Sequence, residues 1–228
     1  MIKGAEKFID KEHYTGEDLK EILALLRAPN GCPWDREQTH QSIRRNMLEE
    51  AYEVAEAIDR ADSAMMTEEL GDILMQVYFH SAIGEEEGEF SLQEVYDRVC
   101  KKLIFRHPHI FADASDASGS SEEGWLAIKR LEKGQKSLFE EMKGVARTLP
   151  SLTRAEKLAG KLSPHEEAAP LYELLTEQAE NLKKSPDSDV LGEILFTLCR
   201  IAKALKIDPE LALFRKNDQK IAQNKKNS

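Results

Sequence analysis

The sequence predicts a folded, helix-rich protein, and three observations support that prediction. Apolar residues recur every three or four positions through most of the chain, which is the spacing of amphipathic helices. Aromatic residues make up only 7% of the chain and charged residues 32%, a composition closer to helical proteins than to β-sandwiches or disordered chains. The 228 residues suffice for one ordinary domain, or two compact helical ones, that bury a core without disulfides.

Helices are expected at several places in the first half, where apolar spacing and end signals coincide. The first stops at the run APNG, residues 28–31, because proline and glycine end helices. A loop is expected over residues 31–40, and Thr67 and Ser91 are suited to capping the helices that follow. The predicted helices span residues 19–26, 42–59, 67–83, 91–105 and 125–133.

A low-complexity run and two proline-containing breaks divide the rest of the chain. Residues 112–124 are small, polar and repetitive, which is typical of a mobile loop or linker. A second group of helices is predicted after Pro150, with interruptions at residues 163–164 and 185–187.

This second group resembles a worn copy of the first. The run LGDIL at residues 70–74 recurs as LGEIL at 191–195, and the acidic run at 48–53 is matched loosely at 172–177. Such repetition predicts an internal duplication. The predicted domains are residues 1–142, including the linker and the helix around Trp125, and residues 143–228.

Charge and cysteine content restrict the partners and the compartment. The chain has 32 Lys and Arg against 42 Asp and Glu, a net charge of −10, so its surface repels nucleic-acid polymers. Three separated cysteines form neither a disulfide framework nor a zinc signature. The N-terminus lacks the apolar stretch of a signal peptide, and no apolar run reaches the roughly 20 residues of a membrane span. We therefore expect a cytoplasmic protein with no membrane or nucleic-acid partner.

The helix predicted over residues 42–59 carries an acidic face. On a helical wheel its apolar residues form one arc, and the opposite arc holds Glu49, Glu50, Glu53 and Glu56. Taken alone, such a run is usually a solvated surface. Glu50, however, borders the apolar stripe.

The helix predicted over residues 67–83 is apolar almost all round, which predicts a buried helix. One narrow polar stripe interrupts it, formed by Glu69, Asp72, Gln76 and His80. Buried carboxylates are costly unless they are protonated, paired with cations or bound to a metal. Few Lys or Arg side chains of these two helices face the acids, so metal ligation is the better account.

The donor type indicates which metal. Oxygen ligands suit Mg²⁺ or Mn²⁺, whereas zinc would bring His or Cys, and His80 is expected to be hydrogen-bonded in place. Because i, i+3 spacing puts both members of a pair on one side of a helix, the acids can face each other across a helix hairpin joined through residues 62–66. The expected ligands are Glu50, Glu53, Glu69 and Asp72.

A metal held by carboxylates usually completes its shell with substrate phosphates and water, which indicates a phosphorylated substrate. Lys101, Lys102 and Arg106 could meet phosphate oxygens; they could equally be surface residues that complement the helix dipole. The sequence contains neither a P-loop nor a GxGxxG run.

These motifs together resemble one family. The EExxE run at residues 49–53 and the ExxD run at 69–72 resemble the signature of the MazG family of nucleoside triphosphate pyrophosphohydrolases. Further segments agree, and the similarity covers most of residues 18 to 133. They are GCPWD at 31–35 with Gln38, RHPHIF at 106–111, and Trp125 with Lys129.

The resemblance implies an all-α helical bundle that forms a homodimer. It also implies hydrolysis of NTPs or dNTPs to the monophosphate and pyrophosphate with Mg²⁺, or Mn²⁺ as a substitute. The residues that match metal ligands are Glu50, Glu53, Glu69 and Asp72. The residues in the nucleotide-binding segments are Trp34, Gln38, Lys101, Lys102, Arg106, Trp125 and Lys129.

Catalytic roles follow from the same resemblance. Lys102 and Arg106 would stabilise phosphate charge, and either Glu49 or Glu53 would receive the proton of the attacking water. The Trp125 indole is suited to stacking on a base. Trp34 is open to two interpretations, a second base contact or a structural plug.

The second half departs from the pattern where chemistry would occur. Leu174 stands in the place of Glu50 and Val190 in the place of Glu69, so only Glu177 and Glu193 keep acidic character. We therefore interpret it as a degenerate domain and assign activity to the first half. The alternatives are a related all-α pyrophosphohydrolase, dUTPase-like or acting on phosphoribosyl-ATP, and a non-catalytic nucleotide-binding or regulatory module.

Overall fold

The structure is a computed structural model that describes residues 2–111, 122–134 and 137–225. These residues form helices joined by turns and contain no strand, which confirms the all-α prediction. Most of the predicted linker, residues 112–121, lies outside the described residues, and its last three residues begin a helix instead. None of the described helices is long and apolar enough to cross a membrane.

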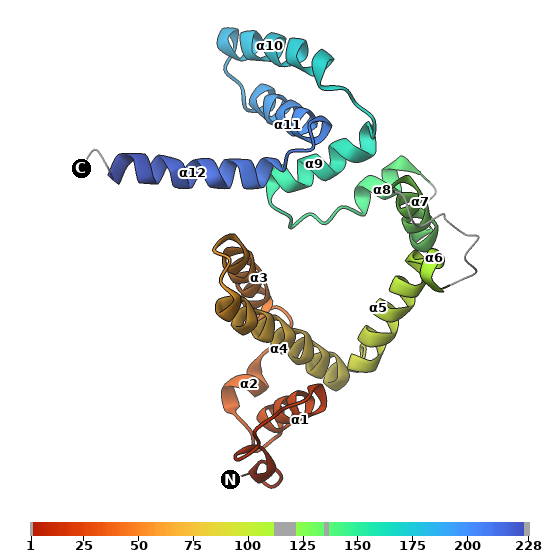
Figure 1. Cartoon of the computed structure of the whole chain (residues 1–228), viewed down its shortest axis with the longest axis vertical. Helices are drawn as coiled ribbons and strands as arrows, with labels where there is room; N and C mark the ends of the chain where they lie inside the picture. Colours follow the sequence, from red (N-terminus) through yellow and green to blue (C-terminus); the bar gives the residue numbers. More distant parts are fainter. Residues whose placement is uncertain (1, 112–121, 135–136, 226–228) are drawn as a thin grey trace. The chain divides into compact units, whose positions relative to one another are not determined.

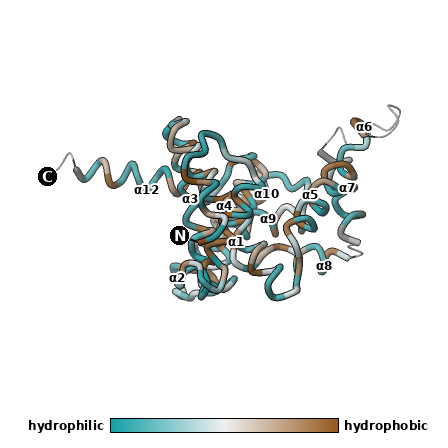
Figure 2. The backbone as a smooth tube through the Cα atoms, turned by 90° about the horizontal axis from the view of Figure 1, so that it is seen from below, coloured by the Kyte–Doolittle hydropathy of each residue, from teal (hydrophilic) through white to brown (hydrophobic). Residues whose placement is uncertain are grey.

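The chain divides into two compact units, residues 1–115 and 116–228 (Figure 1). This division lies N-terminal to the boundary at residue 142 that the duplication predicts, so helices α7 (Glu122–Lys133) and α8 (Leu138–Lys143) belong to the second unit. The duplication itself stays a prediction. In both units polar and apolar residues interchange along the helices (Figure 2).

The first unit is built on a helix hairpin, α3 and α4, with α1 and α5 packed on α4. Its core side chains come from α1, the start of α3, α4 and α5, and are Leu23, Ile43, Tyr78, Phe79, Ile83 and Leu92. The elements are η1 (Glu6–Phe8), α1 (Gly16–Arg27), α2 (Pro33–Glu37), α3 (Arg44–Asp59), α4 (Ser63–Glu87), α5 (Leu92–Arg106) and α6 (Pro108–Phe111).

The start of α4 corrects one prediction. Asp62, not Thr67, caps this helix, because its carboxylate accepts hydrogen bonds from the amides of Ala64 and Met65, both at 3.1 Å. Thr67 lies inside the helix, and its hydroxyl donates to the carbonyl oxygen of Ser63. The hairpin connection is therefore shorter than the predicted residues 62–66.

The other end of α4 lies beyond the predicted residue 83. The helix continues to Glu87 and ends at Gly88, whose φ of 71° is the left-handed conformation that favours glycine. The prediction for the next helix is confirmed, since Ser91 and Glu94 form a reciprocal capping box at the start of α5.

The predicted loop at residues 31–40 contains a short helix, α2, which corrects that prediction. Pro33 is the first residue of α2, where its fixed φ suits a helix start. Gly31 lets the chain pass closely over the end of α1, because a Cβ there would lie 2.2 Å from the Leu26 carbonyl oxygen. Arg27 holds the segment with a hydrogen bond of 2.6 Å to the carbonyl oxygen of Asp35.

Burial along α4 is less uniform than predicted. Its C-terminal half is buried, with Tyr78, Phe79 and Ile83 at most 6% exposed. Its N-terminal half leaves Leu70 49% and Leu74 46% exposed, because α1 and α5 do not extend over it (Figure 1). The prediction of a helix buried all round is therefore wrong for this half.

The second unit contains a second hairpin, α10 and α11, with α9 packed on α11. Its buried residues include Ala159, Leu171, Thr197 and Cys199. The predicted interruptions at residues 163–164 and 185–187 both fall between helices. The elements are α7 (Glu122–Lys133), α8 (Leu138–Lys143), α9 (Ser151–Leu162), α10 (Ala168–Lys184), α11 (Ser188–Ala204) and α12 (Pro209–Lys225).

Candidate functional site

The α3–α4 hairpin brings three carboxylates together. Glu50 of α3 and Glu69 and Asp72 of α4 each place one oxygen so that the three oxygens lie within 4.8 Å of one another. The i, i+3 spacing of Glu69 and Asp72 puts both on one face of α4, and the tight turn after α3 brings Glu50 opposite them. All three side chains are partly buried.

Glu53 lies one helical turn after Glu50 on α3 and belongs to the same group of acids. The two side chains interact, and this interaction is one of the causes that raise the pKa of Glu50. Glu53 also acts electrostatically on Glu69. The four acids that the sequence predicts as ligands therefore lie together, and we call Glu50, Glu53, Glu69 and Asp72 the acidic cluster.

Burial and mutual repulsion perturb the acidic cluster. The pKa of Glu50 is raised, first by burial, then by its hydrogen bond with Glu53 and by the charges of Asp72, Glu53 and Glu69. The pKa of Glu69 is raised by burial and by the neighbouring negative charges. These shifts show that the ionised cluster is destabilised unless a proton or another cation offsets its charge.

Basic side chains near the acidic cluster are engaged elsewhere. Arg45 lies 3.9 Å from Glu49, and Arg60 pairs with Glu56. Within the part of the chain that the structure describes, no Lys or Arg forms an ion pair with the four acids of the cluster. A group of carboxylate oxygens whose negative charge is not offset by Lys or Arg fits a hard divalent cation such as Mg²⁺.

The two candidates for the proton acceptor differ in position. Glu53 lies beside Glu50, whereas Glu49 is exposed and faces Arg45. The structure thus brings Glu53 into the cluster and leaves Glu49 outside it.

The basic residues of α5 are not brought to the acidic cluster within one chain. α5 packs on the C-terminal half of α4, where the hydroxyls of Tyr96 and Tyr78 are 2.5 Å apart. Its C-terminal end then runs away from α3 (Figure 1). Lys101, which lies 3.6 Å from Asp97, is on this distal part of α5, and so are the other two predicted phosphate contacts, Lys102 and Arg106.

Trp34 and Gln38 lie at α2. The Gln38 amide donates to the Trp34 carbonyl oxygen at 2.9 Å and accepts from the Ser42 hydroxyl at 2.6 Å. These bonds fix the segment that leads into α3, so the Gln38 side chain is engaged within the protein. The Trp34 side chain is 59% exposed, which leaves its indole accessible and disfavours the interpretation as a plug.

Trp125 and Lys129 lie on α7, in the second unit. The Lys129 ammonium lies 4.8 Å from the centre of the Trp125 ring, which is a cation–π contact. These two residues therefore contact each other, as their i, i+4 spacing allows.

A second group of possible ligands was not predicted. His40, Glu87 and Glu89 each place one ligand atom within 4.8 Å of the others. Glu87 and Glu89 are two residues apart, but His40 lies more than forty residues earlier in the sequence, so no local spacing reveals the group. The Nδ1 atoms of His40 and His80 are 2.7 Å apart, which bears out the expectation that His80 is hydrogen-bonded in place. Both glutamates are exposed, and exposed acids commonly gather without a metal.

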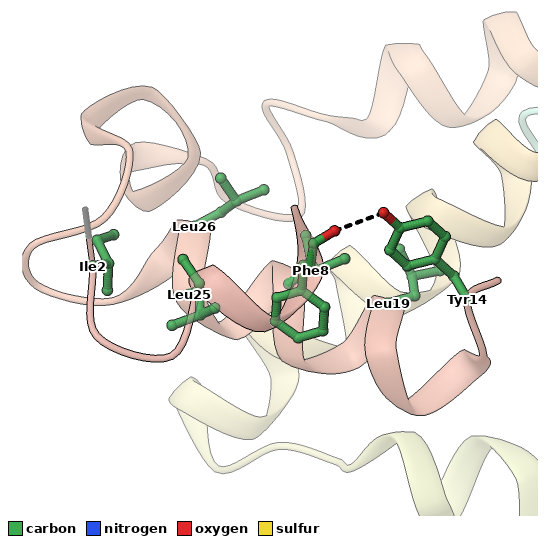
Figure 3. A pocket seen from close by; sticks show the side chains of 8 residues that line it. Ile2, Phe8, Tyr14, Leu19, Leu25 and Leu26 are labelled. Atoms are coloured by element: carbon green, nitrogen blue, oxygen red, sulfur yellow. Dashed lines mark hydrogen bonds between the residues drawn. The ribbon is translucent and has the colours of Figure 1, made fainter. Parts of the chain in front are cut away.

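An apolar cavity of about 470 Å³ lies where the N-terminal segment folds over α1 (Figure 3). The Tyr14 hydroxyl donates to the Phe8 carbonyl oxygen at 2.7 Å across it. The other lining side chains are aliphatic, from Ile2, Ala5, Leu19, Ile22, Leu25 and Leu26. Because no charged side chain lines it, this cavity cannot supply the predicted chemistry.

The described residues of the second unit contain no counterpart of the acidic cluster. Among its described residues no three His, Cys, Asp or Glu side chains lie close enough to hold a metal ion. Leu174 and Val190, which stand in the places of Glu50 and Glu69, are both partly buried on α10 and α11.

Comparison with known proteins supplies the family context. The family model described as the MazG nucleotide pyrophosphohydrolase domain matches residues 38–111, which contain the acidic cluster. A Thermotoga maritima protein named nucleoside triphosphate pyrophosphohydrolase/pyrophosphatase MazG is 38% identical, over 86% of this chain and 79% of its own length. The Escherichia coli K12 nucleoside triphosphate pyrophosphohydrolase is 35% identical, over 88% and 82%. A Bacillus subtilis protein, the uncharacterized protein YabN, is 38% identical over 94% of this chain but only 46% of its own length.

Proposed function

This chain belongs to the MazG nucleotide pyrophosphohydrolase family, and from that premise we propose that it hydrolyses nucleoside triphosphates to nucleoside monophosphates and pyrophosphate. The names of the Thermotoga maritima and Escherichia coli relatives support this reaction. The acidic cluster is the observation that supports placing this reaction in the first unit.

The cluster would hold Mg²⁺, with Mn²⁺ as a possible substitute. The fit is supported by a donor set made only of carboxylate oxygens and by the absence of Lys or Arg partners among the described residues. When bound, the metal would polarise the phosphate oxygens and neutralise part of the triphosphate charge.

The protein's own groups would handle the proton. A water molecule attacks one phosphorus of the anhydride between the α- and β-phosphates, the bond between that phosphorus and the bridging oxygen breaks, and the products are the nucleoside monophosphate and pyrophosphate. Glu53 is the better-placed proton acceptor, because it adjoins Glu50 within the cluster, whereas Glu49 faces Arg45 outside it.

A homodimer would complete the site. In one chain the C-terminal, basic end of α5 runs away from α3 (Figure 1), so Lys102 and Arg106 of a second copy would face the triphosphate. Exposed apolar side chains support such a contact, because a large unpaired apolar surface indicates an interface. They lie on α4 and α5 and are Leu70, Leu74, Leu103, Ile104 and Phe105.

The location would be cytoplasmic. All three cysteines, Cys32, Cys100 and Cys199, are free thiols, which is the state expected in a reducing compartment.

Pyrophosphate release from a panel of NTPs and dNTPs, with Mg²⁺ and with a chelator, tests the proposal. The proposed enzyme releases pyrophosphate from several nucleotides only when Mg²⁺ is present. Release from dUTP alone would favour a dUTPase-like enzyme instead. Nucleotide binding without any release would favour a regulatory module and overturn the proposal.

A further inference from the structure

The second unit contains a large cavity with a basic lining. Its volume is about 1120 Å³, and α7, α8, α9, α11 and the segments between them line it. Seven Lys and Arg side chains line this cavity against four Asp and Glu, an excess of three positive charges in a chain whose net charge is −10. Such a local reversal of sign concentrates anions.

Ion pairs account for only part of this charge. Glu141 lies 3.1 Å from Arg130 and 3.4 Å from Lys161. Glu166 receives two hydrogen bonds from Arg200, at 2.9 and 2.5 Å. Two carboxylates thus pair with three cationic side chains, which leaves a net positive charge on the cavity wall.

Three further lysines, Lys157, Lys203 and Lys206, line the same cavity. No carboxylate among the described residues of the second unit forms an ion pair with them. Lys203 crosses α9 at Gly160, where a Cβ would lie 3.1 Å from its Cε, so the glycine makes room for this side chain.

The remaining two lining carboxylates, Glu156 and Asp208, form no ion pair with these lysines among the described residues. Asp208 accepts a hydrogen bond from the Leu211 amide at the start of α12, at 3.0 Å. Glu156, on α9, acts electrostatically on the buried Cys199 thiol and raises its pKa, after burial itself. The cavity also has an apolar part, because Val145 and Ala159 line it and are at most 6% exposed.

We propose that this cavity binds an anion with two or more linked phosphate groups, either pyrophosphate or the phosphate chain of a nucleoside triphosphate. Several lysines on different helices can contact separate phosphates, which a single phosphate cannot exploit. Because the second unit lacks an acidic cluster among its described residues, the cavity binds this anion without hydrolysing it. The site is distinct from the acidic cluster and does not depend on turnover there.

Lysine footprinting on the full-length protein tests the proposal. The protein is acylated in a chelator-containing buffer, so that no hydrolysis intervenes, with inorganic pyrophosphate, with the α,β-methylene analogue of ATP, or with neither. Mass spectrometry of peptides then reports labelling at each lysine. We expect either ligand to reduce labelling of Lys157 and Lys203 several-fold, while Lys184 on α10 and Lys220 on α12 keep their labelling. Protection by pyrophosphate indicates that phosphates suffice, and protection by the analogue alone indicates that the apolar part contributes.

Charge reversal gives a second readout. The double variant Lys157→Glu/Lys203→Glu should lose at least tenfold in affinity for the protecting ligand by calorimetry. Lys184→Glu/Lys220→Glu has the same net charge change outside the cavity and should stay within about twofold, because distant surface charges are screened. If charge reversal disturbs folding, as circular dichroism would show, Lys157→Gln/Lys203→Gln replaces it. No protection by either ligand, or equal affinities of cavity and control variants, overturns the proposal.

Discussion

Glu50 is a perturbed carboxylate of the acidic cluster, because burial, its interaction with Glu53 and the charges of three neighbouring acids all raise its pKa. Glu50→Gln removes the charge of a proposed metal ligand and relieves repulsion, so we expect pyrophosphate release to fall by more than the roughly 10- to 100-fold that outer-shell substitutions cost. The melting temperature without metal should hold or rise.

Glu56→Gln is the matched control for that substitution. It removes the same charge from the same helix, but its carboxylate pairs with Arg60 outside the cluster. Pyrophosphate release and thermal melting should therefore match the unmodified protein. Unchanged turnover in Glu50→Gln would remove this residue from the metal site.

Tyr78 gives a prediction that depends on pH. Its hydrogen bond with Tyr96, followed by burial, raises the pKa of Tyr78 from 10.0 to about 12. The fold therefore holds the neutral phenol, so the stability that Tyr78 contributes is complete below pH 10 and is lost as the pH rises through 12. Tyr96→Phe should lower the pKa of Tyr78, measured by the ultraviolet absorbance of phenolate. An unchanged pKa of Tyr78 in this variant would mean that the hydrogen bond with Tyr96 is not the cause of the raised pKa.

Spacing in the sequence was enough to find the acidic cluster but not its surroundings. Glu50 and Glu53, like Glu69 and Asp72, are i, i+3 pairs, so each pair shares a helix face wherever the helix lies. The contact of His40 with Glu87 and Glu89 depends instead on how α4 packs against the segment before α3. No local pattern encodes such a contact.

The end of α4 nearest the cluster depends on its capping residue. Asp62 binds two amides of the first turn, so Asp62→Ala should lower the free energy of unfolding by about 0.5–2 kcal/mol. Thr67→Ala should cost less, because Thr67 bonds only a carbonyl within the helix. Urea denaturation of both variants measures the difference. Equal losses would show that Asp62 is not the effective cap.

Helix positions followed from apolar spacing more reliably than helix ends did. Asp62 and Thr67 are both residue types that cap helices, and the sequence alone does not determine at which of the two the helix begins. The helix α2 within residues 31–40 was missed because it is too short to show periodicity. Exposure of Leu70 and Leu74 was missed because periodicity reports an apolar surface, not what covers it.

The two units share a helix hairpin but differ in the groups that the hairpin presents. In the first unit four acids gather between α3 and α4. In the second unit Leu174 and Val190 stand at two of the matched places, and apolar side chains at a packed surface stabilise it by burial, on the order of 25 cal/mol per Å². The second unit is therefore expected to be stable without metal. The sequence predicted this difference between the units, because it depends on single residues at matched positions. The basic cavity could not be predicted in this way, because it forms only when lysines from several helices come together in the fold.

The comparison of Glu69→Ala with Glu193→Ala tests most directly whether the first unit performs the hydrolysis. Both variants remove one carboxylate from the second helix of a hairpin, and both are assayed by pyrophosphate release after folding and oligomeric state have been matched. We expect Glu69→Ala to be inactive, because it breaks the acidic cluster, and Glu193→Ala to keep most of its turnover. Loss of activity in Glu193→Ala as complete as in Glu69→Ala would contradict the assignment of catalysis to the first unit.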